Sequence, residues 1–165
     1  MKSNWFKTIS VAGVLSLAAC NPVDQVNRAD EEIAAFHEAL SEGDGDAIWA
    51  RLGPEARAST SRAEFNEFVE IAHSGLGEFQ DRTRTSMNVN SDNGVTTTEI
   101  SMTTTYANGE ATEVFIFTGE GEDMEVASWN IDSPAVLEAI MEASMEEGSS
   151  AEFNVDATVE ITDVE

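Results

Sequence analysis

Two Asn-Gly pairs constrain the fold of this chain more than any other feature of its sequence. Asn93-Gly94 and Asn108-Gly109 each separate runs rich in β-branched and aromatic residues. Asn-Gly between such runs is the strongest short-range signal of a β-hairpin. A third link, Gly119–Asp123, is a longer turn that contains two glycines. The segment 82–133 is therefore predicted to form a four-stranded antiparallel meander.

Alternation within the predicted strands indicates which residues are buried. Ile100, Met102 and Tyr106 fall on one face and predict a half-buried second strand. The third strand, Val114–Phe117, is apolar on both faces, which is typical of a strand covered from both sides. We expect the early helices on one face, and the last helix or a second copy of the protein on the other. In the fourth strand, strict alternation puts Val126 on one face and Ala127, Trp129 and Ile131 on the other.

Helical signals lie on both sides of the meander. Ser61 and Glu64 form a capping box, which predicts a helix that ends near Gly75. Gly53-Pro54 is expected to end a short helix before it, and Pro134 suits the first turn of a last helix. The predicted helices begin at these capping residues: Asn27 or Asp30, Asp46, Ser61 and Ser133. The fold class is therefore α+β, with N-terminal helices packed on a curved four-stranded antiparallel meander, followed by a C-terminal helix.

The start of the chain has the pattern of an export signal. Lys2 and Lys7 precede the apolar stretch Ile9–Ala19, which is too short to span a bilayer as a helix. The stretch ends in Leu17-Ala18-Ala19-Cys20, which resembles the lipobox of bacterial lipoproteins. This resemblance implies cleavage before Cys20, thioether lipidation of its sulfur and acylation of the new amino terminus. An ordinary secretory signal with a chance cysteine is the alternative.

The lipobox resemblance also implies a location. In enterobacterial sorting, Asp after the lipidated cysteine favours the inner membrane, so Asn21 favours the periplasmic face of the outer membrane. Membrane lipid, reached through Cys20, is thus one expected partner. The expected boundaries are 1–19 for the signal peptide, 20–28 for a tether, 29–147 for the α+β domain and 148–165 for an acidic, disordered tail. The tail alternates apolar and polar residues, so a strand that adds to a sheet edge is the alternative.

Charge and cysteine content exclude several classes of function. The chain has 32 acidic residues, a formal net charge of −24, and no lysine beyond Lys7. Such a surface repels nucleic acid, so we exclude a nucleic-acid partner. Cys20 is the single cysteine. Once it is lipidated, no thiol remains for a disulfide, a thiolate metal site or a nucleophile.

Few residues suggest chemistry. His37 lies at the edge of an apolar helical stripe, which is typical of a half-buried histidine, and proton transfer is the alternative. His73 lies near a predicted helix end, where an imidazole can contact the last carbonyls. Two histidines without cysteine or H-x-x-x-H spacing predict no metal site and no cofactor. Glu42–Asp46 superficially resembles a calcium loop but lacks the distal glutamate, and a helix stop followed by a helix cap explains it.

Three helical segments followed by a meander resemble the cone-shaped nuclear-transport-factor-like (cystatin-like α+β) superfamily, and more narrowly small uncharacterised bacterial periplasmic proteins and lipoproteins. The likeness covers about residues 29–136. It is carried by packing positions, namely Phe36–Leu40, Ala47–Trp49 with Leu52, Glu64-Phe65, Leu76-Gly77, Phe115–Phe117 and Trp129–Pro134. The resemblance implies a fold and transfers no catalytic residue. It also implies a small-ligand site at the mouth of the cone, for which the candidate lining residues are His37, Trp49, Tyr106, Phe117 and Trp129. The alternative is that these aromatic side chains simply belong to the core, as is more common at sheet and helix spacing.

These observations predict a non-catalytic envelope lipoprotein, a binding or accessory module for an unknown protein or small molecule. The alternative is a small enzyme that uses the cone as a pocket, with His37 or a buried acid as base. A homodimer through the sheet face is compatible with both.

Overall fold

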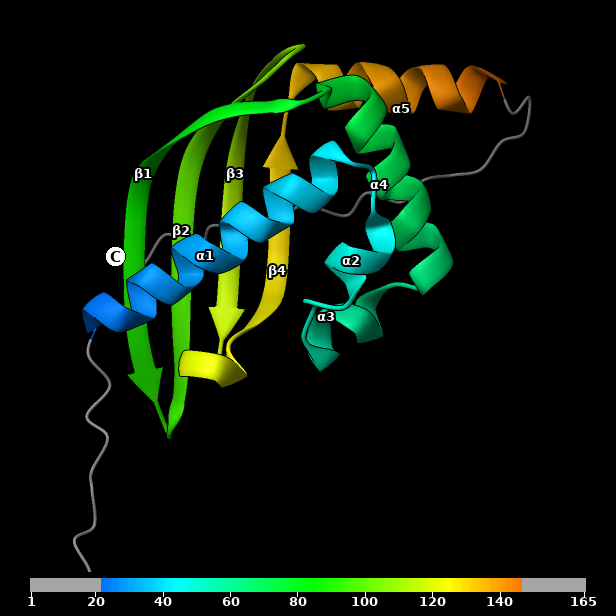
Figure 1. The fold of residues 1–165 in the computed structure, drawn as a ribbon. Helices are drawn as coiled ribbons and strands as arrows, with labels where there is room; N and C mark the ends of the chain where they lie inside the picture. Colours follow the sequence, from blue (N-terminus) through cyan, green and yellow to red (C-terminus); the bar gives the residue numbers. More distant parts are fainter. Residues whose placement is uncertain (1–21, 147–165) are drawn as a thin grey trace, which may run out of the picture.

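The computed structural model describes residues 22–146, and their arrangement confirms the predicted α+β fold (Figure 1). Four helices come first, and four antiparallel strands in the order β1-β2-β3-β4 precede the last helix. The elements are α1 (Pro22–Ser41), α2 (Gly45–Trp49), α3 (Pro54–Ser59), α4 (Arg62–Leu76), β1 (Phe79–Asp92), β2 (Val95–Tyr106), β3 (Gly109–Thr118), the short 3₁₀ helix η1 (Gly121–Asp123), β4 (Glu125–Asp132) and α5 (Pro134–Glu146). The predicted signal peptide, Cys20 and the tail 148–165 lie outside the described residues.

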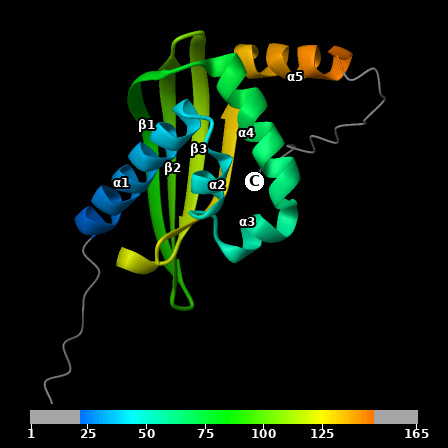
Figure 2. The same ribbon diagram turned by 45° about the vertical axis from the view of Figure 1, so that its right-hand side comes forward.

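The helices are arranged around one face and one edge of the curved sheet. Helix α1 lies diagonally across the face, whereas α2, α3 and α4 lie beyond β4 (Figures 1 and 2). Helix α5 starts at the end of β4 and runs along the end of α4. Within residues 22–146, no helix has the length and apolar character needed to cross a bilayer.

The hairpin turns follow the predicted sequence signals. Asn93 and Gly94 both have positive φ, 51° and 82°, as a two-residue hairpin turn with a right-handed twist requires. In the second hairpin Tyr106 pairs with Gly109, so the two turn residues are Ala107 and Asn108. The turn therefore lies one position earlier than the Asn-Gly pair suggested.

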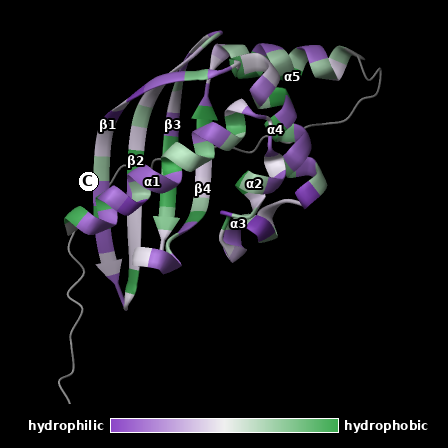
Figure 3. Cartoon of the chain, in the orientation of Figure 1, coloured by the Kyte–Doolittle hydropathy of each residue, from purple (hydrophilic) through white to green (hydrophobic). Residues whose placement is uncertain are grey.

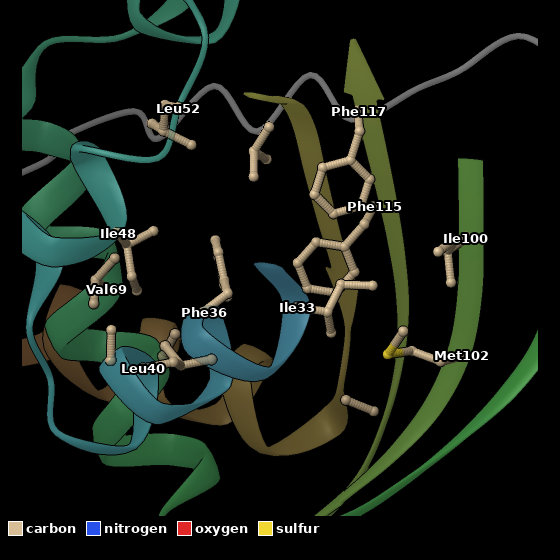
Figure 4. Close-up of a cluster of buried hydrophobic side chains, with 14 of the residues drawn as sticks. Ile33, Phe36, Leu40, Ile48, Leu52, Val69, Ile100, Met102, Phe115 and Phe117 are labelled. Carbon is tan, nitrogen blue, oxygen red and sulfur yellow. The ribbon is translucent and has the colours of Figure 1, made fainter. Parts of the chain in front are cut away.

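The hydrophobic core lies between α1 and the sheet and extends to α2 and α4 (Figure 4). Figure 3 shows green, hydrophobic segments in β3 and β4, whereas β1 is mainly hydrophilic. The ring of Phe36 meets that of Phe115 edge to face, with centroids 5.1 Å apart. The fully buried side chains at the centre are Ile33, Phe36, Leu40, Ile48, Val69, Ile100, Met102, Phe115 and Phe117.

Strand β4 contains a β-bulge that corrects the predicted faces. Ile116 pairs with Ser128 and Phe117 with Val126, which leaves Ala127 as an extra residue. Val126 and Trp129 pair with Phe117 and Phe115, so both lie on the inner face. The prediction that Val126 and Trp129 lie on opposite faces is wrong, because the extra residue of a bulge interrupts the alternation of side chains between the two faces.

Helix α1 begins earlier than predicted. It starts at Pro22 rather than at Asn27 or Asp30, so residues 22–28 of the expected tether are helical. The buried Gln25 side chain donates to the Gly119 carbonyl at 2.8 Å, which holds this first part of the helix on the sheet. The two residues are 94 positions apart in the chain, so this contact cannot be predicted from the local sequence around the start of α1.

Helix α3 was not predicted. Gly53-Pro54 was expected only to end α2, yet Pro54 occupies the first turn of a new helix with Gly53 as its N-cap. The connection before α3 is tied to the sheet, because the Gly53 amide donates to the Val126 carbonyl at 2.8 Å and the Val126 amide donates to the Arg51 carbonyl at 3.0 Å. Helices α2 and α3 are thus anchored at β4.

Helix α5 packs against α4 rather than across the second face of the sheet. Gly75 permits the approach, since a Cβ atom there would lie 2.6 Å from the Ala135 carbonyl oxygen and 3.0 Å from the Ala139 Cβ. On the second face, threonine and serine predominate along β2, and Val114 and Ile116 of β3 are half-buried.

Candidate functional site

A carboxylate, Glu113, lies buried among the aromatic side chains of the sheet. Ala111, Glu113, Phe115 and Phe117 occupy alternate positions of β3 and all face the core. The Glu113 side chain is 0% exposed. Removing a charged group from water costs several kcal/mol unless hydrogen bonds replace the lost hydration, so the partners of Glu113 define this site.

Three side chains donate to the Glu113 carboxylate. His37 Nε2 lies 2.9 Å from Oε2, Thr104 Oγ1 also donates to Oε2, and Trp129 Nε1 lies 2.9 Å from Oε1. Burial alone raises the pKa of Glu113, but the hydrogen bond and the electrostatic attraction of His37, followed by the hydrogen bonds of Thr104 and Trp129, outweigh burial and hold the pKa below its usual value. Glu113 is therefore an ionised carboxylate with both oxygens engaged.

Arg82 fixes the tautomer of His37. Its Nη1 lies 3.3 Å from His37 Nδ1, and a guanidinium group has only donors. Nδ1 therefore accepts, and Nε2 carries the hydrogen that is donated to Glu113. Arg82 Nη2 also donates to the Asp30 carbonyl at 3.0 Å, and the His37 ring stacks on Phe79 with centroids 4.8 Å apart. We call these residues, in order of the chain, the Glu113 network: His37, Arg82, Thr104, Glu113 and Trp129.

Tyr106 lies next to this network without joining it. Its ring centroid is 6.1 Å from that of His37, and its buried hydroxyl forms no hydrogen bond with any residue in the range 22–146. Burial first, and then the negative charge of Glu113, raise the pKa of Tyr106 far above its usual value. The phenol therefore stays protonated, as a buried donor that lies close to the Glu113 carboxylate without a well-formed hydrogen bond.

The structure separates the five predicted pocket residues. It brings together three of them around Glu113: His37, Tyr106 and Trp129. Trp49 lies on α2, where its ring packs against Phe65 with centroids 5.5 Å apart. Phe117 lies further along β3 and stacks on Phe115 at 6.1 Å.

The central residue of the site was missed. Glu113 lies on β3, where the other residues of its face, Ala111, Phe115 and Phe117, are apolar. A carboxylate on the apolar face of a strand can be recognised from the sequence alone. Arg82 and Thr104 give no comparable signal, because polar residues are ordinary at the edge and in the threonine-rich part of a sheet.

The remaining sequence candidates have structural roles. Asp44 caps α2 by accepting from the Ala47 amide at 2.9 Å, and Asp46 pairs with Arg62 at 2.8 Å. His73 Nδ1 donates to the Leu40 carbonyl at 3.1 Å, which ties α4 to the end of α1. Across residues 22–146, no group of three or more His, Cys, Asp or Glu side chains is placed to hold a metal ion.

The Glu113 network joins α1 to every strand of the sheet. His37 comes from α1, and Arg82, Thr104, Glu113 and Trp129 come from β1, β2, β3 and β4 in turn. A carboxylate–imidazole pair can transfer protons, but Glu113 and His37 are only 0% and 1% exposed. As arranged, the network cross-links the core and presents no reactive atom to solvent.

Comparison with known proteins supports the fold. No protein-family model matches the chain, and no curated protein sequence matches it significantly. A variant of Rv3472, a protein of unknown function from Mycobacterium tuberculosis, is similar in structure, with 12% identity, a TM-score of 0.51, and 78% of this chain and 94% of that chain covered. An LEH-like epoxide hydrolase from M. tuberculosis gives 16% identity, a TM-score of 0.34, and coverage of 74% and 98%. Only the first similarity has a TM-score above 0.5, and at 12% identity it supports a shared fold alone.

Proposed function

We propose that the chain is an envelope lipoprotein, tethered through Cys20 on the periplasmic face of the outer membrane, whose domain is a non-catalytic binding or accessory module. The tether rests on the lipobox-like Leu17–Cys20 and the apolar stretch before it. Because α1 already begins at Pro22, a lipid on Cys20 would hold the domain close to the membrane surface.

The single observation that carries the non-catalytic part is the enclosure of the Glu113 network. A general acid or base has to come within hydrogen-bond reach of its substrate. Glu113 and His37 are the residues of the interior best suited to that role, and both are fully enclosed, with Phe36 and Phe115 filling the space beside them. Binding is therefore assigned to the outer surface of the domain.

The tether is tested by labelling in a Gram-negative host. Cells that express the full chain are fed an alkyne fatty acid, and the membrane and soluble fractions are compared for the unmodified chain and Cys20→Ser. We expect label and membrane association in the unmodified chain and neither in Cys20→Ser, whereas Asn21→Asp keeps the label. An unlabelled chain, or a labelled Cys20→Ser, would contradict the tether.

The closed interior is tested by NMR. The indole N–H of Trp129 donates to Glu113, so its ¹⁵N–¹H signal reports on anything that enters the network. A library of small organic fragments is titrated into the labelled protein, with the indole of Trp49 as the internal control on another element. We expect no saturable shift of the Trp129 signal.

A small enzyme is the second candidate, and one observation favours it. The buried Tyr106 hydroxyl forms no well-formed hydrogen bond within residues 22–146, although it lies beside a carboxylate–imidazole pair. A ligand that reached the interior through a movement of α1 would find one donor and one proton-transfer pair. A saturable shift of the Trp129 indole that disappears in Tyr106→Phe would establish this reading and overturn the non-catalytic one.

A homodimer through the second face of the sheet stays a prediction. Val114 and Ile116 are the apolar residues that β3 presents there, among threonine and serine neighbours. Light scattering on Cys20→Ser tests it, since a dimer that Ile116→Thr converts to a monomer would support the sheet interface.

A further inference from the structure

Helix α5 carries a second apolar face that no described residue covers. Leu137, Met141 and Met145 are 60%, 52% and 74% exposed, and their spacing of four residues places them in one row along the helix. Val136, in contrast, is buried in the core. We call the exposed row Leu137, Met141 and Met145 the α5 stripe. Isolated exposed apolar residues are ordinary, but three large ones in a row form a continuous patch.

A row of carboxylates borders the α5 stripe. Glu138 and Glu142 directly follow Leu137 and Met141, so each points about 100° further round the helix. Both glutamates are exposed, and α5 contains no basic residue. The helix therefore presents an apolar strip with negative charge along one side.

We propose that the α5 stripe is the docking site for a basic amphipathic helix of another protein. Such a helix places apolar anchors at every third or fourth residue against the stripe, and its Lys and Arg residues against Glu138 and Glu142. Methionine side chains are flexible and polarisable, so Met141 and Met145 can adapt to different apolar anchors. The row spans about two turns, roughly 12 Å, which suits a short helical segment.

Charge disfavours the other occupants. In a symmetric pair of chains, two acidic rows would face each other, and the chain has a net charge of −24. Residues 147–165 contain acidic residues and no basic ones, so they lack the complementary charge. An anionic membrane surface is repelled by the same glutamates. A basic amphipathic helix complements both the apolar α5 stripe and the glutamates beside it.

This inference deepens the proposed function, because it names the partner class of the binding module. Peptide binding by the α5 stripe requires no lipid on Cys20, so the docking proposal and the tether proposal can be refuted independently. If Cys20 is never lipidated, the peptide experiment below is unaffected, and if no basic helix binds, the labelling experiment still decides the tether.

The test is fluorescence anisotropy with the full chain carrying Cys20→Ser. The probe is a labelled synthetic amphipathic helix built from leucine and lysine alone, and the control probe has the same composition with scrambled order. One variant removes the stripe (Leu137→Gln with Met141→Gln) and one removes the charge (Glu138→Gln with Glu142→Gln). The matched controls are Val95→Gln, an exposed apolar residue at the first hairpin, and Glu122→Gln with Asp123→Asn, two exposed acids in η1.

We expect the amphipathic probe to bind more tightly than the scrambled one. The stripe variant should weaken binding by about tenfold or more, and the charge variant by several-fold with a weaker dependence on salt. The control variants should bind like the parent chain, and circular dichroism should show all variants folded. Equal binding of both probes, or equal loss in the controls, would overturn the proposal.

Two further results would also overturn it by naming another occupant. One is stripe-dependent pelleting with phosphatidylcholine vesicles without stripe-dependent peptide binding. The other is a dimer, measured by light scattering, that the stripe variant converts to a monomer.

Discussion

His37 Nε2 lies 2.9 Å from Glu113 Oε2, although the two residues are 76 positions apart in the chain. The bond joins α1 to the middle of the sheet and lies inside the core. A hydrogen bond to a buried charge is worth more than one between neutral groups, and loss of one partner leaves the other unsatisfied. The stability of the domain should therefore depend on this contact more than on any surface ion pair.

Replacing the Glu113 carboxylate by an amide should destabilise the domain. In Glu113→Gln one carboxylate oxygen becomes an NH₂ group, which then faces the N–H of either His37 or Trp129. We expect the free energy of unfolding to fall by about 2–4 kcal/mol, measured by chemical denaturation. Glu110→Gln, on the same strand but exposed, is the control and should change stability by less than about 0.5 kcal/mol. Equal effects of the two changes would contradict the role of the network.

The advantage of Glu113 over glutamine should disappear in acid. The pKa of Glu113 is lowered in the folded state from the ordinary value of 4.5. Its stabilisation is therefore complete above pH 4.5 and is lost as the pH falls through the folded pKa. The difference in unfolding free energy between the unmodified chain and Glu113→Gln should be constant near neutral pH and shrink below pH 4.5. The unmodified chain is compared with Glu113→Gln because all other carboxylates titrate in both proteins, so their contributions to the pH dependence cancel in the difference. A difference that grows in acid would show that the shift has the opposite sign.

Arg82 should supply the hydrogen bond that Nδ1 of His37 accepts. In Arg82→Met the apolar stem remains, but Nδ1 of His37 loses its donor and the Asp30 carbonyl loses another. Imidazole ¹⁵N shifts should show the Nε2–H tautomer in the unmodified chain, and in the variant the Nδ1 signal should move because its hydrogen bond is lost, with a loss of about 1 kcal/mol per hydrogen bond. Arg84→Met removes only an exposed ion pair with Asp30 and should leave the His37 signals unchanged. An unmodified chain with Nδ1 protonated would refute this assignment.

Alanine should not be tolerated at Gly75, although it favours helix. A Cβ there meets the Ala135 carbonyl oxygen, which is backbone and cannot turn aside, so α5 has to shift. We expect Gly75→Ala to cost about 1–3 kcal/mol in a denaturation experiment, after the gain in helix propensity. Ser74→Ala, at the exposed neighbouring position, should be close to neutral. A Gly75→Ala variant as stable as the parent would mean that α5 does not pack closely on α4.

Local signals were sufficient for most of the fold. The capping box Ser61–Glu64 and the Asn93-Gly94 turn appear as predicted, because each depends on residues a few positions apart. The predicted start of α1 is too late, since the first part of the helix is held by a hydrogen bond from Gln25 to Gly119, which lies far along the chain. Helix α3 was missed because Gly53-Pro54 suits both the end of one helix and the start of the next.

The site was predictable only in part. His37 and Trp129 were selected as aromatic or titratable residues on apolar faces, and both contact Glu113. Glu113 itself could have been found from the alternation of β3. The roles of Arg82 and Thr104 depend on how β1 and β2 register beside β3, and two register shifts in β1 make that register unreadable from spacing.

The bulge at Ala127 decides which face of β4 carries Trp129. If Ala127 paired with Ile116 and removed the bulge, Ser128 would lie opposite Phe115 and Trp129 would turn towards the second face. Glu113 Oε1 would then lose its indole donor, and an ionised oxygen would be stranded in an apolar interior. The bulge, rather than the methyl group of Ala127, therefore keeps the Trp129 indole within reach of the Glu113 carboxylate.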